Sequence, residues 1–94
     1  MAKTETAAGK DRWSLVPWES MRQVVRAFTF GAAKHDKPGV IGYRTADPEM
    51  YFDAAMRHLA EYRCGTRADH ETGLHPLAHA AASLLVVIWH ELKE

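Results

Sequence analysis

Apolar residues recur at helical spacing in two segments of the chain, and a third segment is apolar almost throughout. In residues 17–35, Met21, Val24, Val25 and Phe28 recur at steps of three and four, which predicts one buried helical stripe. Residues 48–64 continue as a second helix, and residues 76–91 are apolar around most of their circumference, as in a helix buried on several sides. Nothing alternates long enough to demand a strand. We therefore expect an all-α fold, a small bundle of about three main helices.

Residues that favour helix ends stand at the borders of these segments. Pro17, Pro48 and Pro76 each suit the first turn of a helix, where the N–H that proline lacks would have no partner. Asp47 can cap the second helix, and Gly65 can end it. These positions predict helices that begin near residues 17, 48 and 76.

Two stretches show no helical period. Residues 1–11 are polar and predict a flexible N-terminal tail, and the prolines and glycines of residues 36–47 predict a loop. The remainder has the length of one small domain, so we expect a single all-α domain over residues 12–94.

Three short helices bury little surface, yet the third is more apolar than two neighbours can cover. This surplus predicts a homo-oligomer, a dimer or larger.

Composition narrows the class of protein. The chain is 47% hydrophobic and 26% charged, which is ordinary for a globular domain. Its formal net charge is zero, from 12 Lys+Arg against 12 Asp+Glu, so no basic excess indicates nucleic-acid binding. The single cysteine, Cys64, excludes an internal disulfide and fits a reducing compartment. No signal peptide or membrane-length apolar run is visible. We expect a cytoplasmic protein with neither a membrane nor a nucleic acid as partner.

Polar residues gather at the start of the most apolar segment. Residues 69–90, "DHETGLHPLAHAAASLLVVIWH", hold four of the six histidines together with Asp69 and Glu71. His75, His79 and His90 fall within roughly 80° of one another on the third helix. His58 lies on the core side of the second helix. If these two helices pack antiparallel, His58 and His79 can meet in the interior.

Most of these residues also have a purely structural interpretation. His79 is the hardest to explain structurally, since an imidazole one turn into an apolar helix needs a buried partner. For the others the alternatives are a solvated salt-bridged face (Glu49, Asp53, Arg57), a favourable helix-dipole position (Glu19), a turn (Asp69, Glu71), a core histidine (His58), a helix-entry residue (His75) and surface histidines (His35, His70, His90). Acids mixed with histidines suit Mg²⁺ or Mn²⁺. One thiol is too few for a structural zinc site.

Four short motifs, taken in order, carry a family resemblance. They are the Leu-x-Pro-x-Glu helix start at 15–19, "FGAAK" at 30–34, "RHL" at 57–59, and "DxETGL" at 69–74 running into "LAHA" at 77–80. Over residues 10–90 the chain resembles the phage-type dATP/dGTP diphosphohydrolase family, a small MazG-like branch of the all-α NTP pyrophosphohydrolases. The resemblance implies hydrolysis of a purine (deoxy)nucleoside triphosphate to the monophosphate and pyrophosphate. MazG-like relatives are dimers or tetramers.

The resemblance also implies a divalent metal, Mg²⁺ or Mn²⁺, and a set of site residues. Relatives hold the metal with ExxE and ExxD pairs, which the three helices of this chain lack. The "LAHAA" helix takes the place of the ExxD helix, so His79 stands where a ligand is expected. The implied metal ligands are Glu19, Asp53, Asp69, Glu71 and His79. The implied catalytic residues are His58, His79 and Glu71. The implied substrate-binding residues are Lys10, Arg12, Lys34, Arg57 and His75, with Trp13, Trp18 or Tyr43 stacking on the purine.

Two other classes compete with the enzyme. In a non-catalytic homo-oligomeric interaction module, the third helix is an interface and the histidines satisfy one another. A DNA-associated regulator would need a basic helix face, and the sequence shows none.

Overall fold

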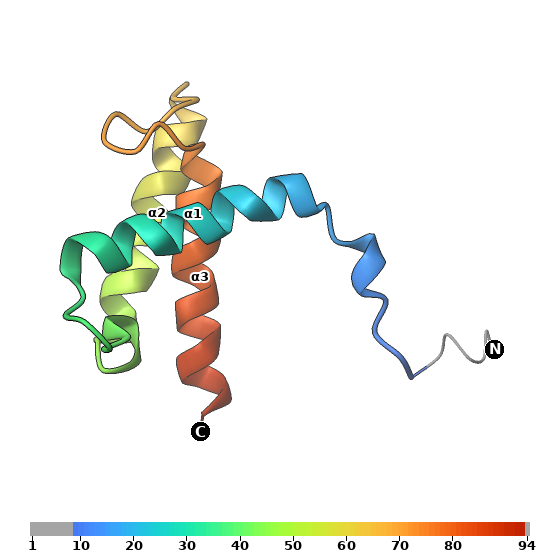
Figure 1. Ribbon diagram of the computed structural model, residues 1–94. Helices are drawn as coiled ribbons and strands as arrows, with labels where there is room; N and C mark the ends of the chain where they lie inside the picture. The colour runs from blue at the N-terminus through green and yellow to red at the C-terminus, as the bar shows by residue number, and fades with distance from the viewer. Residues whose placement is uncertain (1–8, 94) are drawn as a thin grey trace.

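The structure is a computed structural model that describes residues 9–93 (Figure 1). Three α-helices make up the bundle, α1 (Trp18–His35), α2 (Pro48–Arg63) and α3 (Pro76–Leu92). Two short 3₁₀ turns, η1 (Trp13–Leu15) and η2 (Gly42–Arg44), precede α1 and α2. No strand occurs in residues 9–93, which confirms the all-α prediction. Most of the predicted tail, residues 1–8, lies outside the described residues.

The helix ends follow the local chemistry of the sequence. The N–H of Glu49 donates to Oδ1 of Asp47 at 3.0 Å, and Pro48 occupies the first turn of α2. Beyond α2, Gly65 adopts a left-handed φ of 110°, which favours glycine because it has no side chain. These ends confirm the predicted boundaries. The segment 36–47, predicted to be a plain loop, contains the 3₁₀ turn η2.

The three helices pack around α3. In Figure 1, α2 and α3 run side by side in opposite directions, and α1 crosses them. Val24 and Ala27 of α1 form a core cluster with Leu74 and with Ala78 and Ala82 of α3. The alanines let the helices approach closely, so the core is built from small side chains.

Helical geometry places His79 where the three helices meet. Ala78, which packs against α1, and Ala80 are both buried. Residues two positions apart on a helix are separated by about 200° around its axis, so Ala80 lies on the far side of α3 from Ala78, toward α2. His79 points between these two buried faces. Its position in the fold therefore explains how an imidazole enters an apolar helix.

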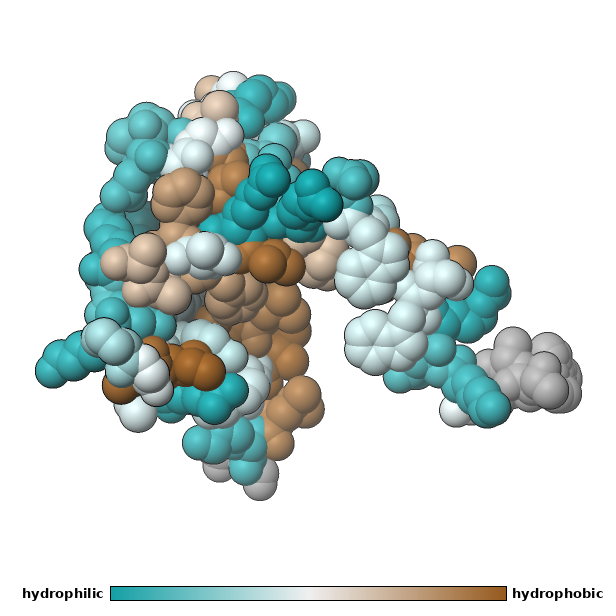
Figure 2. Space-filling view, in the orientation of Figure 1, coloured by the Kyte–Doolittle hydropathy of each residue, from teal (hydrophilic) through white to brown (hydrophobic). Residues whose placement is uncertain are grey.

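Large apolar side chains remain exposed on this single chain. Trp13 of η1 is 69% exposed, and Trp18, the first residue of α1, is 56% exposed. The N-terminal arm, which is the segment from residue 9 through η1 to the start of α1, extends away from the bundle in Figure 1. Figure 2 shows further apolar surface over α3, where Ile88 and Leu92 are exposed. The predicted surplus of apolar surface is thus present. None of the helices in residues 9–93 is long and apolar enough to cross a membrane.

Candidate functional site

Asp69 holds together the loop between α2 and α3. Its Oδ2 accepts hydrogen bonds from the backbone N–H of Glu71 at 3.0 Å and of Thr72 at 2.9 Å. The Asp69 N–H donates to the carbonyl of Leu74, and the Gly73 N–H donates to the carbonyl of Asp69, both at 2.7 Å. Gly73 adopts a φ of 75°, which permits the tight turn. The loop is therefore folded around one carboxylate.

The Asp69 carboxylate is kept in its ionised form by these donors. Burial alone would raise its pKa, but the N–H groups of Thr72 and Glu71, the Thr72 hydroxyl at 3.2 Å and nearby His79 outweigh burial. The net result is a pKa below the usual value. The hydrogen bonds found in the described residues use Oδ2, which leaves Oδ1 as an acceptor.

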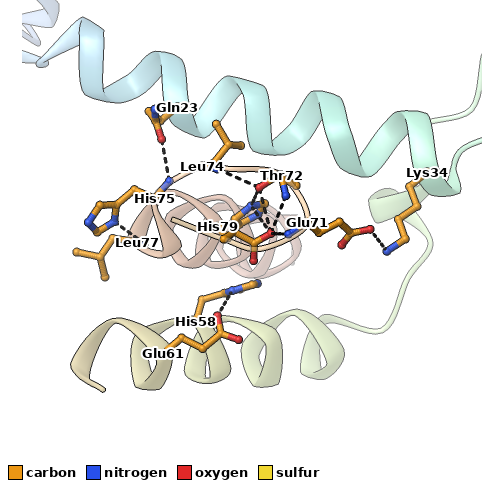
Figure 3. A network of polar contacts seen from close by, with 11 residues as sticks. Gln23, Lys34, His58, Glu61, Glu71, Thr72, Leu74, His75, Leu77 and His79 are labelled. Atoms are coloured by element: carbon orange, nitrogen blue, oxygen red, sulfur yellow. Dashed lines mark hydrogen bonds and ion pairs between the residues drawn. The ribbon is translucent and has the colours of Figure 1, made fainter. Parts of the chain in front are cut away.

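His79 reaches this loop from the first turns of α3 (Figure 3). Its Nε2 lies 2.7 Å from Oγ1 of Thr72 and 4.0 Å from Oδ2 of Asp69. The side chains of His79 and Asp69 are only 15% and 10% exposed. Burial lowers the pKa of His79, and although Asp69 opposes this, the net pKa lies below the usual 6.5. The ring is therefore neutral near pH 7.

His58 of α2 stacks on His79. The two ring centroids are 4.9 Å apart with an angle of 24° between the planes. Nδ1 of His58 lies 3.1 Å from Oε1 of Glu61, one turn further along α2. Because a carboxylate accepts, Nδ1 of His58 donates, and in the neutral form of this ring the lone pair is on Nε2. Antiparallel packing of α2 and α3 thus brings the two histidines together, as the sequence predicts for that packing.

Three of these side chains could hold a metal ion. One ligand atom each from His58, Glu61 and Asp69 lies within 4.8 Å of the others. A single ion with bonds of about 2.0–2.6 Å can bridge atoms at that spacing. Glu61 was missed from the sequence, although its i, i+3 spacing from His58 places both on one face of α2. The spacing of His58 and Glu61 is visible in the sequence, but the group is complete only when the loop that contains Asp69 folds back beside α2.

Glu71 lies beside this group and pairs with α1. Its Oε2 lies 2.7 Å from Nζ of Lys34, which ties the Asp69 loop to the end of α1 (Figure 3). The hydrogen bond and the charge of Lys34 lower the pKa of Glu71. Both side chains are more than half exposed, so their charges remain accessible to solvent and to a ligand.

Two cavities meet at His79. The larger, of about 800 Å³, lies between the helices and is lined by Phe28, Tyr43, Arg57 and His79, among others. The smaller, of about 520 Å³, is lined by Lys34, Glu71, Thr72 and His79, among others. A mostly apolar cavity bordered by charged and titratable groups is the usual form of a small-molecule site.

The remaining predicted residues lie apart from this cluster. Lys10, Arg12 and Glu19 are exposed and lie on or near the N-terminal arm that leaves the bundle. Asp53 is exposed on α2 and falls outside the three-residue group of candidate ligands. Glu49, Asp53 and Arg57, all within the described residues, show no ion pair with one another, so the predicted salt-bridged face is absent.

Two histidines proved to have local structural roles. His75 caps α3, because its Nδ1 accepts from the N–H of Leu77 at 3.0 Å, and its own N–H donates to Gln23. This matches the helix-entry interpretation. His90 was predicted to lie on the surface, and that prediction is wrong. It is half-buried, with Nε2 2.8 Å from the carbonyl oxygen of Tyr43, because η2 folds back against α3.

Comparison with known proteins gives one family. The family model described as "dATP/dGTP diphosphohydrolase, N-terminal" matches residues 1–94. A "dATP/dGTP diphosphohydrolase" of Salmonella phage PMBT28 is 33% identical over 81 residues, which cover 86% of this chain and 27% of the relative. The chain thus spans about a quarter of that relative's length. No solved structure matches this chain. The chain belongs to the family of N-terminal dATP/dGTP diphosphohydrolase domains.

Proposed function

We propose that this chain provides a metal-dependent site that hydrolyses a purine deoxynucleoside triphosphate to the monophosphate and pyrophosphate. One observation carries the proposal, the group of His79, Asp69, His58 and Glu61 beside the larger cavity. Such a group combines a neutral imidazole with carboxylate and imidazole ligands for a metal, which are the parts that phosphoanhydride hydrolysis requires. The name of the phage relative supports the choice of substrate.

The residues present fit a divalent ion of mixed nitrogen and oxygen preference. His58, Glu61 and Asp69 would hold it, since their ligand atoms already lie within 4.8 Å of one another. The imidazole makes Mn²⁺ a better match than Mg²⁺, which favours oxygen ligands alone. When bound, the ion offsets the negative charge of the triphosphate and makes the phosphorus more electrophilic.

The protein's own groups account for binding and for the proton. The cavity of about 800 Å³ is within the range of small-molecule sites and accepts the nucleoside, with Tyr43 against the purine. Arg57 and Lys34, on the walls of the two cavities, bind phosphate oxygens. His79 accepts a proton from water, the water oxygen forms a bond to the α-phosphorus, and the bond from that phosphorus to the leaving pyrophosphate breaks. Pyrophosphate departs with the bonding electron pair.

A pyrophosphate-release assay tests the proposal. The chain is incubated with dATP, dGTP, dCTP or dTTP in Mn²⁺ or in Mg²⁺, and pyrophosphate and single phosphate are measured separately. We expect pyrophosphate from dATP or dGTP and faster turnover in Mn²⁺. Glu61→Gln should abolish the metal-dependent rate, whereas Glu91→Gln, on exposed α3 surface, should retain it. Inactivity toward every nucleotide in both metals would refute the proposal.

The second candidate is a non-catalytic interaction module, and the exposed apolar side chains favour it. Trp13, Trp18 and Leu92 are each more than half exposed, and such surface is typical of an interface. The module predicts a dimer or tetramer without turnover.

Light scattering tests whether the chain associates. Since both candidates include a homo-oligomer, we expect at least twice the chain mass of 10.6 kDa at micromolar concentration. Trp18→Gln should weaken the association, whereas Arg22→Gln, exposed one turn further along α1, serves as a control. A mass of one chain at that concentration would contradict the homo-oligomer in both candidates.

A further inference from the structure

We infer that Thr72 is a positioning residue that fixes His79 in the tautomer protonated at Nε2. The residue is half-buried in the loop that Asp69 closes, beside His79 in Figure 3. Its hydroxyl is within hydrogen-bond distance of both the Asp69 carboxylate and the His79 ring. Neither the family description nor the name of the phage relative assigns it a role.

The inference follows from counting the donors and acceptors around one oxygen. A threonine hydroxyl offers one hydrogen and two lone pairs. Around Oγ1 of Thr72 lie three partners, the N–H of Leu74 at 3.2 Å, Oδ2 of Asp69 at 3.2 Å and Nε2 of His79 at 2.7 Å. The N–H of Leu74 can only donate, so it uses one lone pair.

The ionised carboxylate of Asp69 can only accept. The single hydroxyl hydrogen of Thr72 therefore belongs to Oδ2, and one lone pair of Oγ1 remains. That lone pair faces Nε2 of His79, which must donate to it. Each group then has a partner of the opposite kind, in a chain that runs from His79 through Thr72 to Asp69.

The opposite tautomer leaves a conflict. If the Thr72 hydroxyl donated to Nε2 of His79, Oγ1 and Oδ2 of Asp69 would face each other at 3.2 Å with no hydrogen between them. Two acceptors at that distance repel each other in a partly buried site, where unpaired polar atoms are costly. The arrangement therefore selects Nε2–H and leaves the lone pair of the ring on Nδ1.

This assignment names the atom of His79 that can accept a proton. The hydrogen bonds of the His79 ring within residues 9–93 involve Nε2 alone, so Nδ1 is the basic nitrogen of that ring. If the proposed function holds, on which this step rests, Nδ1 receives the proton of the attacking water. Thr72 then acts through His79, as the residue that orients the base.

Nitrogen-15 NMR of the histidine rings tests the tautomer without any substrate. At about pH 8, above the usual imidazole pKa, a protonated ring nitrogen and an unprotonated one resonate far apart. We expect Nε2 of His79 to carry the proton in the wild-type chain. In Thr72→Val, the ratio of Nε2–H to Nδ1–H should fall about fivefold, the change that corresponds to one hydrogen bond of about 1 kcal/mol.

Matched variants separate tautomer selection from folding. Thr72→Ser keeps the hydroxyl and should restore the wild-type ratio, whereas Thr66→Val, at an exposed threonine in the same connection, should not change it. If circular dichroism shows that Thr72→Val does not fold, the nitrogen-15 spectra of wild type and of Thr72→Ser still test which ring nitrogen of His79 carries the proton. A proton on Nδ1 in either chain, or an unchanged ratio in folded Thr72→Val, would overturn the inference.

A kinetic measurement distinguishes failure of the inference about Thr72 from failure of the proposed function. In an active chain, Thr72→Val should lower kcat, leave KM unchanged and be rescued by Thr72→Ser. Wild-type kcat in Thr72→Val would overturn the inference while the hydrolase stands. A chain that hydrolyses nothing, yet shows the Thr72-dependent Nε2–H form, would retain the inference and refute the hydrolase.

Discussion

The two ends of α3 use the same residue type in opposite ways. His79 near the start lies 2.7 Å from a hydroxyl, 4.0 Å from a carboxylate and against a second imidazole. His90 near the end lies 2.8 Å from the backbone carbonyl of Tyr43 and meets the ring of Trp89 edge-on at 5.0 Å. Both rings are half-buried on one helix.

The two histidines differ in whether their neighbours can only accept a hydrogen bond or can also carry charge and hold a metal. A carbonyl only accepts, so Nε2 of His90 is fixed as a donor and ties η2 to α3. Tyr43 and Trp89, with ring centroids 5.6 Å apart, complete an aromatic contact at that end. At the His79 end the neighbours are an ionised acid and groups that could hold a metal. A histidine on a buried stripe thus becomes a candidate for chemistry only when ionisable partners converge on it.

The largest expected effect separates the two histidines by activity. His79→Ala should lower kcat by about 100-fold or more, because the proton acceptor is lost. His90→Ala should leave kcat unchanged and raise KM a few-fold, about 0.5–1 kcal/mol, because Tyr43 on the cavity wall loses its tie to α3. Steady-state kinetics of pyrophosphate release measures both. Equal loss of kcat in the two variants would erase the distinction between the two ends.

The next effect concerns the stability of the His79 end. Asp69→Ala removes the acceptor of two backbone N–H groups and one hydroxyl, and should cost about 2–3 kcal/mol of unfolding free energy. Asp53→Ala, at an exposed carboxylate of α2, should change it by less than about 0.5 kcal/mol. Urea denaturation compares the two variants with wild type. If Asp69→Ala were as stable as Asp53→Ala, the loop would not depend on the carboxylate.

A smaller effect is expected at the other end. His90→Ala removes one hydrogen bond to the carbonyl of Tyr43 and part of the contact with Trp89, at a cost of about 1 kcal/mol. His70→Ala is the matched control, since His70 is exposed in the loop before α3. Thermal unfolding of both variants measures the difference. A wild-type melting temperature for His90→Ala would show that η2 is held by other contacts.

The smallest effect is a pH dependence confined to the His79 end. The folded pKa of His79 lies below the usual 6.5, so the unfolded chain binds the proton more readily. Folding stability is therefore full above about pH 6.5 and falls as the pH decreases toward the folded pKa. The lowered pKa of Asp69 acts in the same direction below pH 3.8. Urea denaturation between about pH 7.5 and pH 5 measures this dependence. The unfolding free energy should fall less steeply with decreasing pH in His79→Gln than in wild type.

Much of the fold could be predicted because its signals act over a few residues. Pro48, Asp47 and Gly65 set the ends of α2 through groups one to three positions away. The apolar coverage of residues 76–91 predicts a helix buried on more than one side, as α3 is. The order of the short motifs indicated the family to which the chain belongs.

The site itself required the tertiary structure. The sequence indicated that His58 and His79 would meet if two helices packed antiparallel, but it missed Glu61 and placed His90 on the surface. Both errors have one cause. Glu61 becomes a candidate ligand only when the Asp69 loop returns beside α2, and His90 is covered only when η2 folds against α3. Helix ends depend on neighbours in sequence, whereas contacts between one helix and the loop or turn that folds against it depend on the tertiary structure.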